Sequence, residues 1–298
     1  MRDAVLLLAH GAPERSEEVG EYLMLVRGGR PLAPELVEEI RSRYDAIGGG
    51  SPLTARTQAQ AAALERKLAA DGLPVPVYFG MRNWRPSILE TMTRMKADGI
   101  ERIAAICLAP QYSKFSIGLY FRRTQEAKTQ LGFNADILWA KSYHDHPLLI
   151  EAFAQRLAPL LPAQMVLFTA HSLPEKILET ADAYDAEAKA TARAVAARLS
   201  LQRWEFAYQS QGLTDEKWLG PTVESKIDEY AQAGIQDLAL APIGFVSDHV
   251  EILYDVDILF RNYAAERGIR LRRPESLNDS PTFIAALADV ARQKLGAG

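Results

Sequence analysis

Residues 5–12 (VLLLAHGA) and residues 165–173 (MVLFTAHSL) decide the fold of this chain. Each is a short apolar run that ends in Ala-His followed by a small residue. An uninterrupted apolar run of this length is typical of a β-strand that is covered on both faces. The two histidines, His10 and His171, are therefore expected at the carboxyl ends of two buried strands.

A second pair of runs repeats this organisation. Residues 106–113 (ICLAPQYS) and 238–247 (LALAPIGFVS) both reach Leu-Ala-Pro, and in each half of the chain they follow the Ala-His run. This order predicts two similar halves, and the alternative is that common strand endings recur by chance. We predict domains over residues 1–143 and 164–298, joined by a connecting segment over residues 144–163.

Helix-forming stretches separate the apolar runs. Residues 57–68 (TQAQAAALERKL) and 186–199 are rich in residues that favour helices. Strands that alternate with helices form parallel sheets with crossover helices, so the chain is expected to have an α/β fold. Ligands of such sheets bind beyond the carboxyl ends of the strands, which places the predicted site in the crevice between the halves.

The composition excludes several classes of protein. The chain has 298 residues, of which 48% are hydrophobic and 24% charged, as in ordinary globular proteins. Its net charge of -4 gives no overall field for nucleic acid, so no nucleic-acid partner is expected. The longest apolar runs fall far short of the ~20 residues of a membrane helix, so no integral membrane segment is expected. The single cysteine, Cys107, forms no internal disulfide and holds no iron–sulfur cluster, which favours a cytoplasmic protein.

Three carboxylates follow the last long apolar run. Asp248, Glu251 and Asp255 are spaced three and four residues apart, which puts them on one face of a helix. A solvated acidic face is the simpler interpretation, but most residues between them are apolar. Carboxylates at a cleft guide a hard cation or carry protons. Glu251 facing His171 from the other half would suit a metal ion in transit, because this set is incomplete for a permanent structural metal.

A glycine-rich loop and several basic residues form a second candidate region. Residues 47–53 (IGGGSPL) let backbone amides approach an anion, but they lack the Lys-Ser/Thr of a nucleotide-binding P-loop. Residues 27–31 (RGGRP) precede this loop, and Arg122-Arg123 lies downstream. Each basic stretch alone is typical of a solvated surface. Together they favour a ligand with several carboxylates.

Six segments, in order along the chain, resemble the ferrochelatase family, most closely its coproporphyrin III ferrochelatase branch in bacteria. They are residues 47–53 (IGGGSPL), 108–113 (LAPQYS), 170–174 (AHSLP), 208–212 (YQSQG), 218–221 (WLGP) and 244–251 (GFVSDHVE). The resemblance implies two Rossmann-like, chelatase-type domains with a porphyrin cleft between them. It also implies insertion of ferrous iron into coproporphyrin III in haem biosynthesis, because residues 27–31 stand where protoporphyrin enzymes carry a longer apolar lip.

The resemblance assigns roles to matching positions of this chain. His171 matches the family's essential histidine, Glu251 matches its partner carboxylate across the cleft, and Asp255 continues the acidic row. The resemblance implies that these three residues are catalytic and that His171 and Glu251 contact the iron. The positions that it implies for porphyrin binding are His10, Arg27, Arg43, Tyr44, Ser51, Tyr120 and Tyr208.

Two positions depart from the coproporphyrin branch. His10 stands where that branch often has a tyrosine that ligates the product iron, a role that imidazole can also fill. Arg82-Asn83 stands where some members have Lys-His, which argues against an auxiliary metal site there.

The resemblance implies no organic cofactor, with ferrous iron and the porphyrin as substrates. It also allows transient contacts with neighbouring haem-pathway enzymes. Several alternatives stay open at this point. The first two are a protoporphyrin IX ferrochelatase and a cobalt or nickel chelatase that acts on another tetrapyrrole. The third is a non-enzymatic protein that binds haem, another tetrapyrrole or a small anion.

Overall fold

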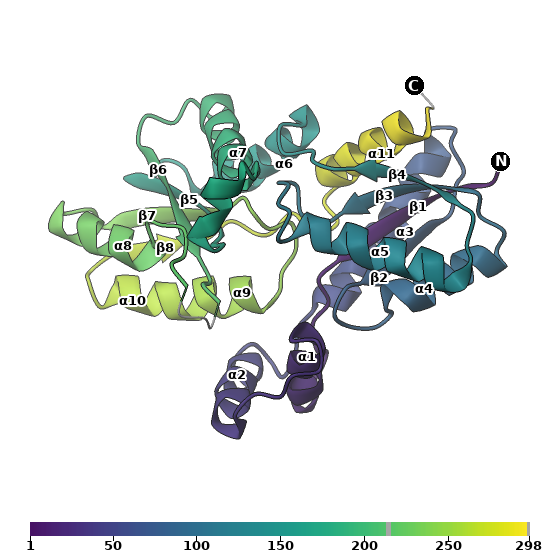
Figure 1. Ribbon diagram of the computed structural model, residues 1–298. Coiled ribbons are helices and arrows are strands. Elements are labelled where there is room, and N and C mark those ends of the chain that lie inside the picture. The colour runs from purple at the N-terminus through teal and green to yellow at the C-terminus, as the bar shows by residue number, and fades with distance from the viewer. Residues whose placement is uncertain (213–215, 297–298) are drawn as a thin grey trace.

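Two parallel β-sheets with the same strand order form the frame of the protein (Figure 1). The structure, a computed structural model, describes residues 1–212 and 216–296. The first sheet has the order β2 (Val77–Met81), β1 (Asp3–Ala9), β3 (Arg102–Cys107) and β4 (Asp136–Ala140). The second has the order β6 (Trp204–Gln209), β5 (Met165–His171), β7 (Asp237–Pro242) and β8 (Arg270–Arg272). Strands β1 and β5 occupy equivalent positions, which confirms the predicted α/β fold with two similar halves.

Helices connect the strands and cover the sheets. The first half contains η1 (Ser16–Glu18), α1 (Val19–Val26), α2 (Pro34–Ala46), α3 (Leu53–Ala70), α4 (Ile88–Ala97) and α5 (Ile117–Leu131). The remainder contains α6 (Pro147–Leu157), η2 (Ala158–Leu160), η3 (Glu175–Thr180), α7 (Tyr184–Arg198), α8 (Val223–Gln232), α9 (Val250–Leu253), the π-helix η4 (Asp255–Phe260), α10 (Arg261–Ala265) and α11 (Pro281–Leu295). Across the described ranges, no helix combines the length and hydropathy needed to cross a membrane.

Strand β1 is buried on both faces, as its uninterrupted apolar sequence predicts. Val5 and Leu7 pack into a core with side chains of α3 and α11, whereas Leu6 and Leu8 pack into a second core with side chains of α4 and α5. All four side chains are fully buried. Because helices cover both faces of the sheet, the carboxyl ends of its strands are the part left free to bind a ligand.

The segment between β1 and α3 leaves the first sheet. After β1 the chain forms η1, α1 and α2, of which α1 and α2 lie apart from both sheets in Figure 1. The loop that follows α2 contains Gly48 and Gly49 with φ angles of 108° and 94°, a region that favours glycine. At Gly50 a Cβ atom would come within 1.8 Å of the backbone oxygen of Glu14. Chain geometry therefore accounts for these three glycines without a bound anion.

Helix α11 ties the two halves together. It follows β8, the last strand of the second sheet, and packs against α3, β3 and β4 of the first half. It also packs against α6, which lies in the connecting region. The predicted domains 1–143 and 164–298 each contain one complete sheet, and their boundaries stay a prediction.

Candidate active site

A cavity of about 250 Å³ opens between the carboxyl ends of the strands of the two sheets. The first half contributes to its wall the side chains of His10, Tyr22, Tyr44, Arg82 and Tyr120. The second half contributes those of His171, Tyr184, Phe245, His249 and Glu251. His10 follows β1 and His171 ends β5, so the equivalent ends of the two central strands meet at the cavity, as the sequence predicts.

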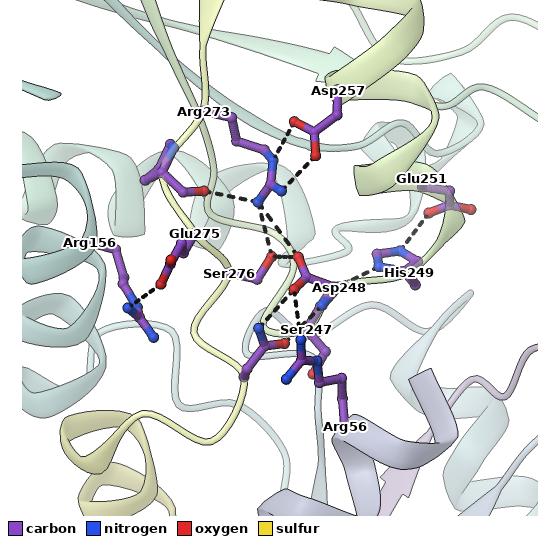
Figure 2. Close-up of polar contacts among 12 residues, drawn as sticks. Arg56, Arg156, Ser247, Asp248, His249, Glu251, Asp257, Arg273, Glu275 and Ser276 are labelled. Carbon is purple, nitrogen blue, oxygen red and sulfur yellow. Dashed lines mark hydrogen bonds and ion pairs between the residues drawn. The ribbon is translucent and has the colours of Figure 1, made fainter. Parts of the chain in front are cut away.

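Glu251 lies between two imidazoles on one wall of this cavity. Its Oε1 atom is 3.5 Å from Nε2 of His171, and its Oε2 atom is 3.3 Å from Nε2 of His249. Glu251 is in α9, and His249 caps the start of that helix with extended backbone, so its ring turns back toward the carboxylate. Figure 2 shows the contact between His249 and Glu251.

The expectation that His171 and Glu251 face each other from opposite halves is wrong. His171 ends β5 and Glu251 follows β7, and these neighbouring strands belong to the same sheet. The parallel arrangement brings their carboxyl ends to the same edge, which explains why the two side chains meet within the second half. The first half supplies other parts of the cavity wall, including His10 and Tyr120.

The surroundings of both imidazoles favour their protonated forms. Nδ1 of His171 contacts the carbonyl oxygen of Ser172, and Nδ1 of His249 is 2.9 Å from the carbonyl oxygen of Ser247. Both ring nitrogens of each histidine therefore face an oxygen acceptor, which only an imidazolium satisfies at both positions. Burial alone would lower the pKa of each histidine, but the Glu251 carboxylate, the backbone carbonyl acceptors and the Asp255 charge together outweigh burial and raise both pKa values.

The same contacts control the acidity of Glu251. Burial would raise the pKa of its carboxyl group, but the charges and hydrogen bonds of His171 and His249 hold that pKa well below its usual range. These contacts favour the ionised carboxylate. Because two protonated imidazoles flank it, the three groups present a net negative charge to a cation only after both imidazoles have lost their protons.

Asp255 lies further along the same segment, in the first turn of the π-helix η4. Its side chain is buried and accepts a hydrogen bond from the hydroxyl group of Ser210. Burial, together with the charge of Glu251, raises the pKa of Asp255 to about 6, although Ser210 and Arg43 oppose this shift. Asp255 does not line the cavity itself, so it stands behind Glu251 as a group that changes its protonation state close to neutral pH.

His10 differs from the other two cavity histidines because its imidazole is neutral. Burial and the nearby Arg82 charge lower its pKa to about 4. Its Nδ1 atom is 3.1 Å from the carbonyl oxygen of Gly11, and its Nε2 atom is 3.1 Å from the side-chain amide nitrogen of Asn83. A proton on Nδ1 lets His10 donate to Gly11 and accept from Asn83.

Of the other residues predicted to bind a porphyrin, two line the cavity. Tyr44 and Tyr120 are buried in its wall, and the guanidinium of Arg82 lies 4.8 Å from the centre of the Tyr120 ring. Burial raises the pKa of Tyr120 to about 12, so this hydroxyl group keeps its proton.

The four remaining predicted residues do not line the cavity. The hydroxyl oxygen of Ser51 accepts a hydrogen bond from the backbone nitrogen of Leu53 at the start of α3. Arg43 pairs with Glu39 at 2.7 Å, and Arg27 is exposed at the end of α1. The structure buries the Tyr208 side chain next to α7.

Tyr208 points away from the cavity because of its place on β6. Its hydroxyl group donates to Asp185 of α7, and its ring packs with Ala170, Ile177 and Tyr184. The next residue, Gln209, points to the other side of the strand, where its amide nitrogen donates to the carbonyl oxygen of Glu251 at 2.9 Å.

Sequence reasoning assigned no catalytic or porphyrin-binding role to several residues of the cavity wall, among them Tyr22, Arg82 and Tyr184. His249 lies just beyond the end of an apolar run and within residues 244–251, which the sequence singles out, but no sequence signal assigned it a role of its own. Tyr22 comes from α1, whose position depends on how the segment between β1 and α3 packs. In the described part of the chain no group of three His, Cys, Asp or Glu side chains is arranged as a metal site.

Comparisons with known proteins agree with this geometry. Residues 2–295 match the Ferrochelatase family model. A ferrochelatase of Acidobacterium capsulatum is 46% identical over 320 residues, which cover 99% of this chain and 95% of that protein. A coproporphyrin III ferrochelatase of Geobacillus thermodenitrificans is 35% identical over 302 residues, which cover 98% of this chain and 95% of that protein.

The fold is also found in a solved structure with little sequence similarity. The sirohydrochlorin chelatase SirB of Bacillus subtilis subspecies spizizenii, in complex with cobalt, has a TM-score of 0.62 at 12% identity. The alignment covers 99% of this chain and 95% of that one, so the two-sheet architecture is shared along its whole length. The family match over almost all residues, together with the relatives at 35–46% identity, shows that the chain belongs to the ferrochelatase family of metal chelatases.

Proposed function

We propose that the protein inserts ferrous iron into coproporphyrin III, giving iron coproporphyrin III, in haem biosynthesis in the cytoplasm. The observation that carries the proposal is the carboxylate of Glu251 between His171 and His249 on the wall of a cavity lined by aromatic side chains. The family match supports iron insertion into a porphyrin as the reaction class. Coproporphyrin III as the substrate is part of the proposal and goes beyond the family match.

The reaction requires proton removal at the place where iron enters. Inserting a divalent metal displaces two pyrrole protons, and iron must exchange its water ligands for protein and then porphyrin nitrogens. Neutral imidazole and carboxylate both bind ferrous iron, and the imidazole must first lose its proton. In the proposal, Glu251 attracts the ion. His171 first gives up its own proton to solvent and then either contacts the iron or accepts one pyrrole proton. The pyrrole protons that His171 does not take pass by way of the ionised Asp255, behind Glu251, to solvent.

The other cavity residues serve to hold the macrocycle. The rings of Tyr22, Tyr44 and Tyr120 supply apolar surface and hydroxyl groups that stay protonated, because burial raises each pKa. Contacts remote from the ring nitrogens can hold a flat macrocycle out of plane, which exposes the nitrogen lone pairs to the metal. The neutral imidazole of His10 is suited to contact the product iron once Asn83 releases its Nε2 atom.

Three observations support a substrate with four propionates. Arg82 lines the cavity, and within residues 1–212 and 216–296 no carboxylate lies at ion-pair distance from it, so a ligand carboxylate can pair with it. Arg27 and Arg43 are at least partly exposed on the segment between β1 and α3. Several relatives at 34–37% identity are named coproporphyrin III ferrochelatases, whereas the relative from Acidobacterium capsulatum is named ferrochelatase only.

The test is anaerobic insertion of ferrous iron into coproporphyrin III and protoporphyrin IX, measured side by side by the loss of free-base fluorescence. We expect a higher kcat/KM for coproporphyrin III. A higher kcat/KM for protoporphyrin IX would contradict the substrate assignment and leave iron insertion standing. Binding of both porphyrins without insertion of iron would make the protein a tetrapyrrole carrier, and Glu251→Gln would then keep full ligand binding.

A further inference from the structure

Arg273 contacts two aspartates, Asp257 and Asp248, which lie at the two ends of the segment that carries Glu251 (Figure 2). Its guanidinium donates to Asp257 through two nearly parallel hydrogen bonds, of 2.9 Å from Nε and 2.7 Å from Nη2. Its Nη1 atom donates to the carbonyl oxygen of Pro274 at 2.9 Å and lies 3.6 Å from Oδ1 of Asp248. The side chain is 11% exposed, so these bonds form with little competition from water.

Asp248 is held mainly by the chain segment that follows β8. Ser276 donates to its Oδ1 atom at 2.7 Å, and the side-chain amide of Asn278 donates to its Oδ2 atom at 2.8 Å. The backbone nitrogen of Asp248 donates to the Asn278 side-chain oxygen at 3.0 Å. Arg56 of α3 adds a longer contact of 3.9 Å from the first half.

Asp248 and Asp257 lie at the two ends of the part of the chain that carries the groups proposed to act on the iron and its protons. His249 directly follows Asp248, Glu251 comes next, and Asp255 precedes Asp257 by two residues. Between them the backbone passes from α9 into the π-helix η4, in which the nitrogen of Leu259 donates to the carbonyl oxygen of Tyr254 at 2.9 Å. A π-turn adds a residue to the helical repeat, so the direction of the preceding side chains depends on how both ends are anchored.

We infer that Arg273 is a positioning residue for iron insertion, because it anchors both ends of the segment from Asp248 to Asp257 and so fixes the distance between Glu251 and His171. The inference rests on the proposed function, in which Glu251 receives the iron. Arg273 touches neither the cavity nor Glu251, and it acts through Asp248 and Asp257. Loss of the guanidinium removes the cation that the two carboxylates share. Asp248 keeps its bonds to Ser276 and Asn278, whereas Asp257 keeps, among the described residues, only the exposed Arg261 at 3.1 Å, so the Asp257 end of the segment becomes free to shift.

The neighbouring residue offers a matched control. Arg272 makes the same kind of paired hydrogen bonds, from Nε and Nη2 to the two oxygens of Asp237 on the adjacent strand β7. It is 21% exposed and has no contact with the segment from Asp248 to Asp257. Substituting Arg272 removes a partly buried arginine–aspartate pair from the same part of the fold, whereas substituting Arg273 also loosens the segment from Asp248 to Asp257.

The experiment compares Arg273→Gln, Arg273→Lys, Arg272→Gln and Glu251→Gln with the wild-type protein. It measures the melting temperature, the dissociation constant of coproporphyrin III by fluorescence titration, and kcat and KM for ferrous iron. For Arg273→Gln we expect the KM for iron to rise about tenfold and kcat to fall, because small displacements of reacting groups are costly. Porphyrin affinity should stay within about twofold of wild type.

Arg273→Lys keeps the charge but cannot form the paired bonds to Asp257, so its KM for iron should lie between wild type and Arg273→Gln. It is also the variant to measure if Arg273→Gln does not fold. Arg272→Gln should show a similar drop in melting temperature while kcat and KM stay within about twofold of wild type.

Two results would overturn the inference. The first is a wild-type KM for iron in both Arg273 variants, and the second is an equal rise in Arg272→Gln. If Glu251→Gln is inactive while the Arg273 variants behave like wild type, the inference alone fails. If Glu251→Gln inserts iron at the wild-type rate, the proposed role of Glu251 fails and the inference fails with it.

Discussion

The Nε2 atom of His171 lies 3.5 Å from the Oε1 atom of Glu251, at the meeting point of two neighbouring strands of the second sheet. This pair combines a base that can release its proton with a carboxylate that does not take one up. Its position on the wall of a cavity shared by both halves gives a metal ion and a macrocycle access to the same two groups.

The acidic side of the pH–rate profile should report Asp255. Its pKa is raised to about 6, so its carboxyl group is neutral below that pH and becomes a carboxylate above it. We expect kcat/KM for ferrous iron to increase as the pH rises through about 6, because the ionised group can accept protons. In Asp255→Asn this increase should disappear. An unchanged profile in that variant would assign the titration to another group.

Asp255 should also make the folded protein less stable at neutral pH. Its pKa is about 6 in the folded protein, against an ordinary aspartate value of 3.8 that applies to the unfolded chain. The folded protein therefore binds the proton more tightly between these values, and the free energy of unfolding falls as the pH rises through them. The carboxylate then costs about 3 kcal/mol above pH 7. Asp255→Asn should be more stable than wild type in urea at pH 8, with a smaller difference at pH 4, and equal differences at both pH values would contradict this account.

Tyr208→Phe tests the position of the Tyr208 hydroxyl group. In the structure it bonds to Asp185, whereas the family resemblance implies that Tyr208 binds the porphyrin. The hydroxyl group is bonded to Asp185 and lies outside the cavity wall, so its removal should cost about 2 kcal/mol of stability. Porphyrin affinity should stay within about twofold of wild type. A strong loss of coproporphyrin III binding without loss of stability would place the hydroxyl group at the ligand after all.

Arg82→Gln tests the pairing of a propionate with the cavity cation. A charged hydrogen bond contributes roughly 1.5–3 kcal/mol, so the affinity for coproporphyrin III should fall about tenfold or more. We expect a smaller loss for protoporphyrin IX, which carries two fewer carboxylates. The matched control is Arg123→Gln, which removes an exposed arginine paired with Glu126 on the surface. Equal losses for the two porphyrins would argue against a role of Arg82 in choosing the substrate.

The fold and the centre of the site follow from local patterns in the sequence. The apolar runs before His10 and His171 indicate buried strands, and parallel sheets bring strand ends together, so the meeting of these residues at one cavity is predictable. The four-residue spacing likewise places Glu251 and Asp255 on one helical segment. The prediction that Asp248 shares their helical face is wrong, because Asp248 precedes α9 and its carboxylate bonds to Ser276 and Asn278. Neither step needs long-range information beyond the strand order.

Other features depend on distances that the sequence does not contain. The side of β6 to which Tyr208 points is decided by the register of the strand, and one residue of difference exchanges Tyr208 with Gln209. Tyr22 reaches the cavity because α1 places its ring against those of His10 and Trp84, which no local pattern indicates. The pairing of His171 and Glu251 within one half follows from the adjacency of β5 and β7.

The most direct test is iron insertion by His171→Ala under anaerobic conditions, with coproporphyrin III affinity measured on the same preparation. We expect insertion to be abolished while the dissociation constant of the porphyrin stays within about tenfold of wild type, because the imidazole acts on the metal and the proton and not on the grip of the macrocycle. Turnover close to that of the wild-type protein would contradict the account.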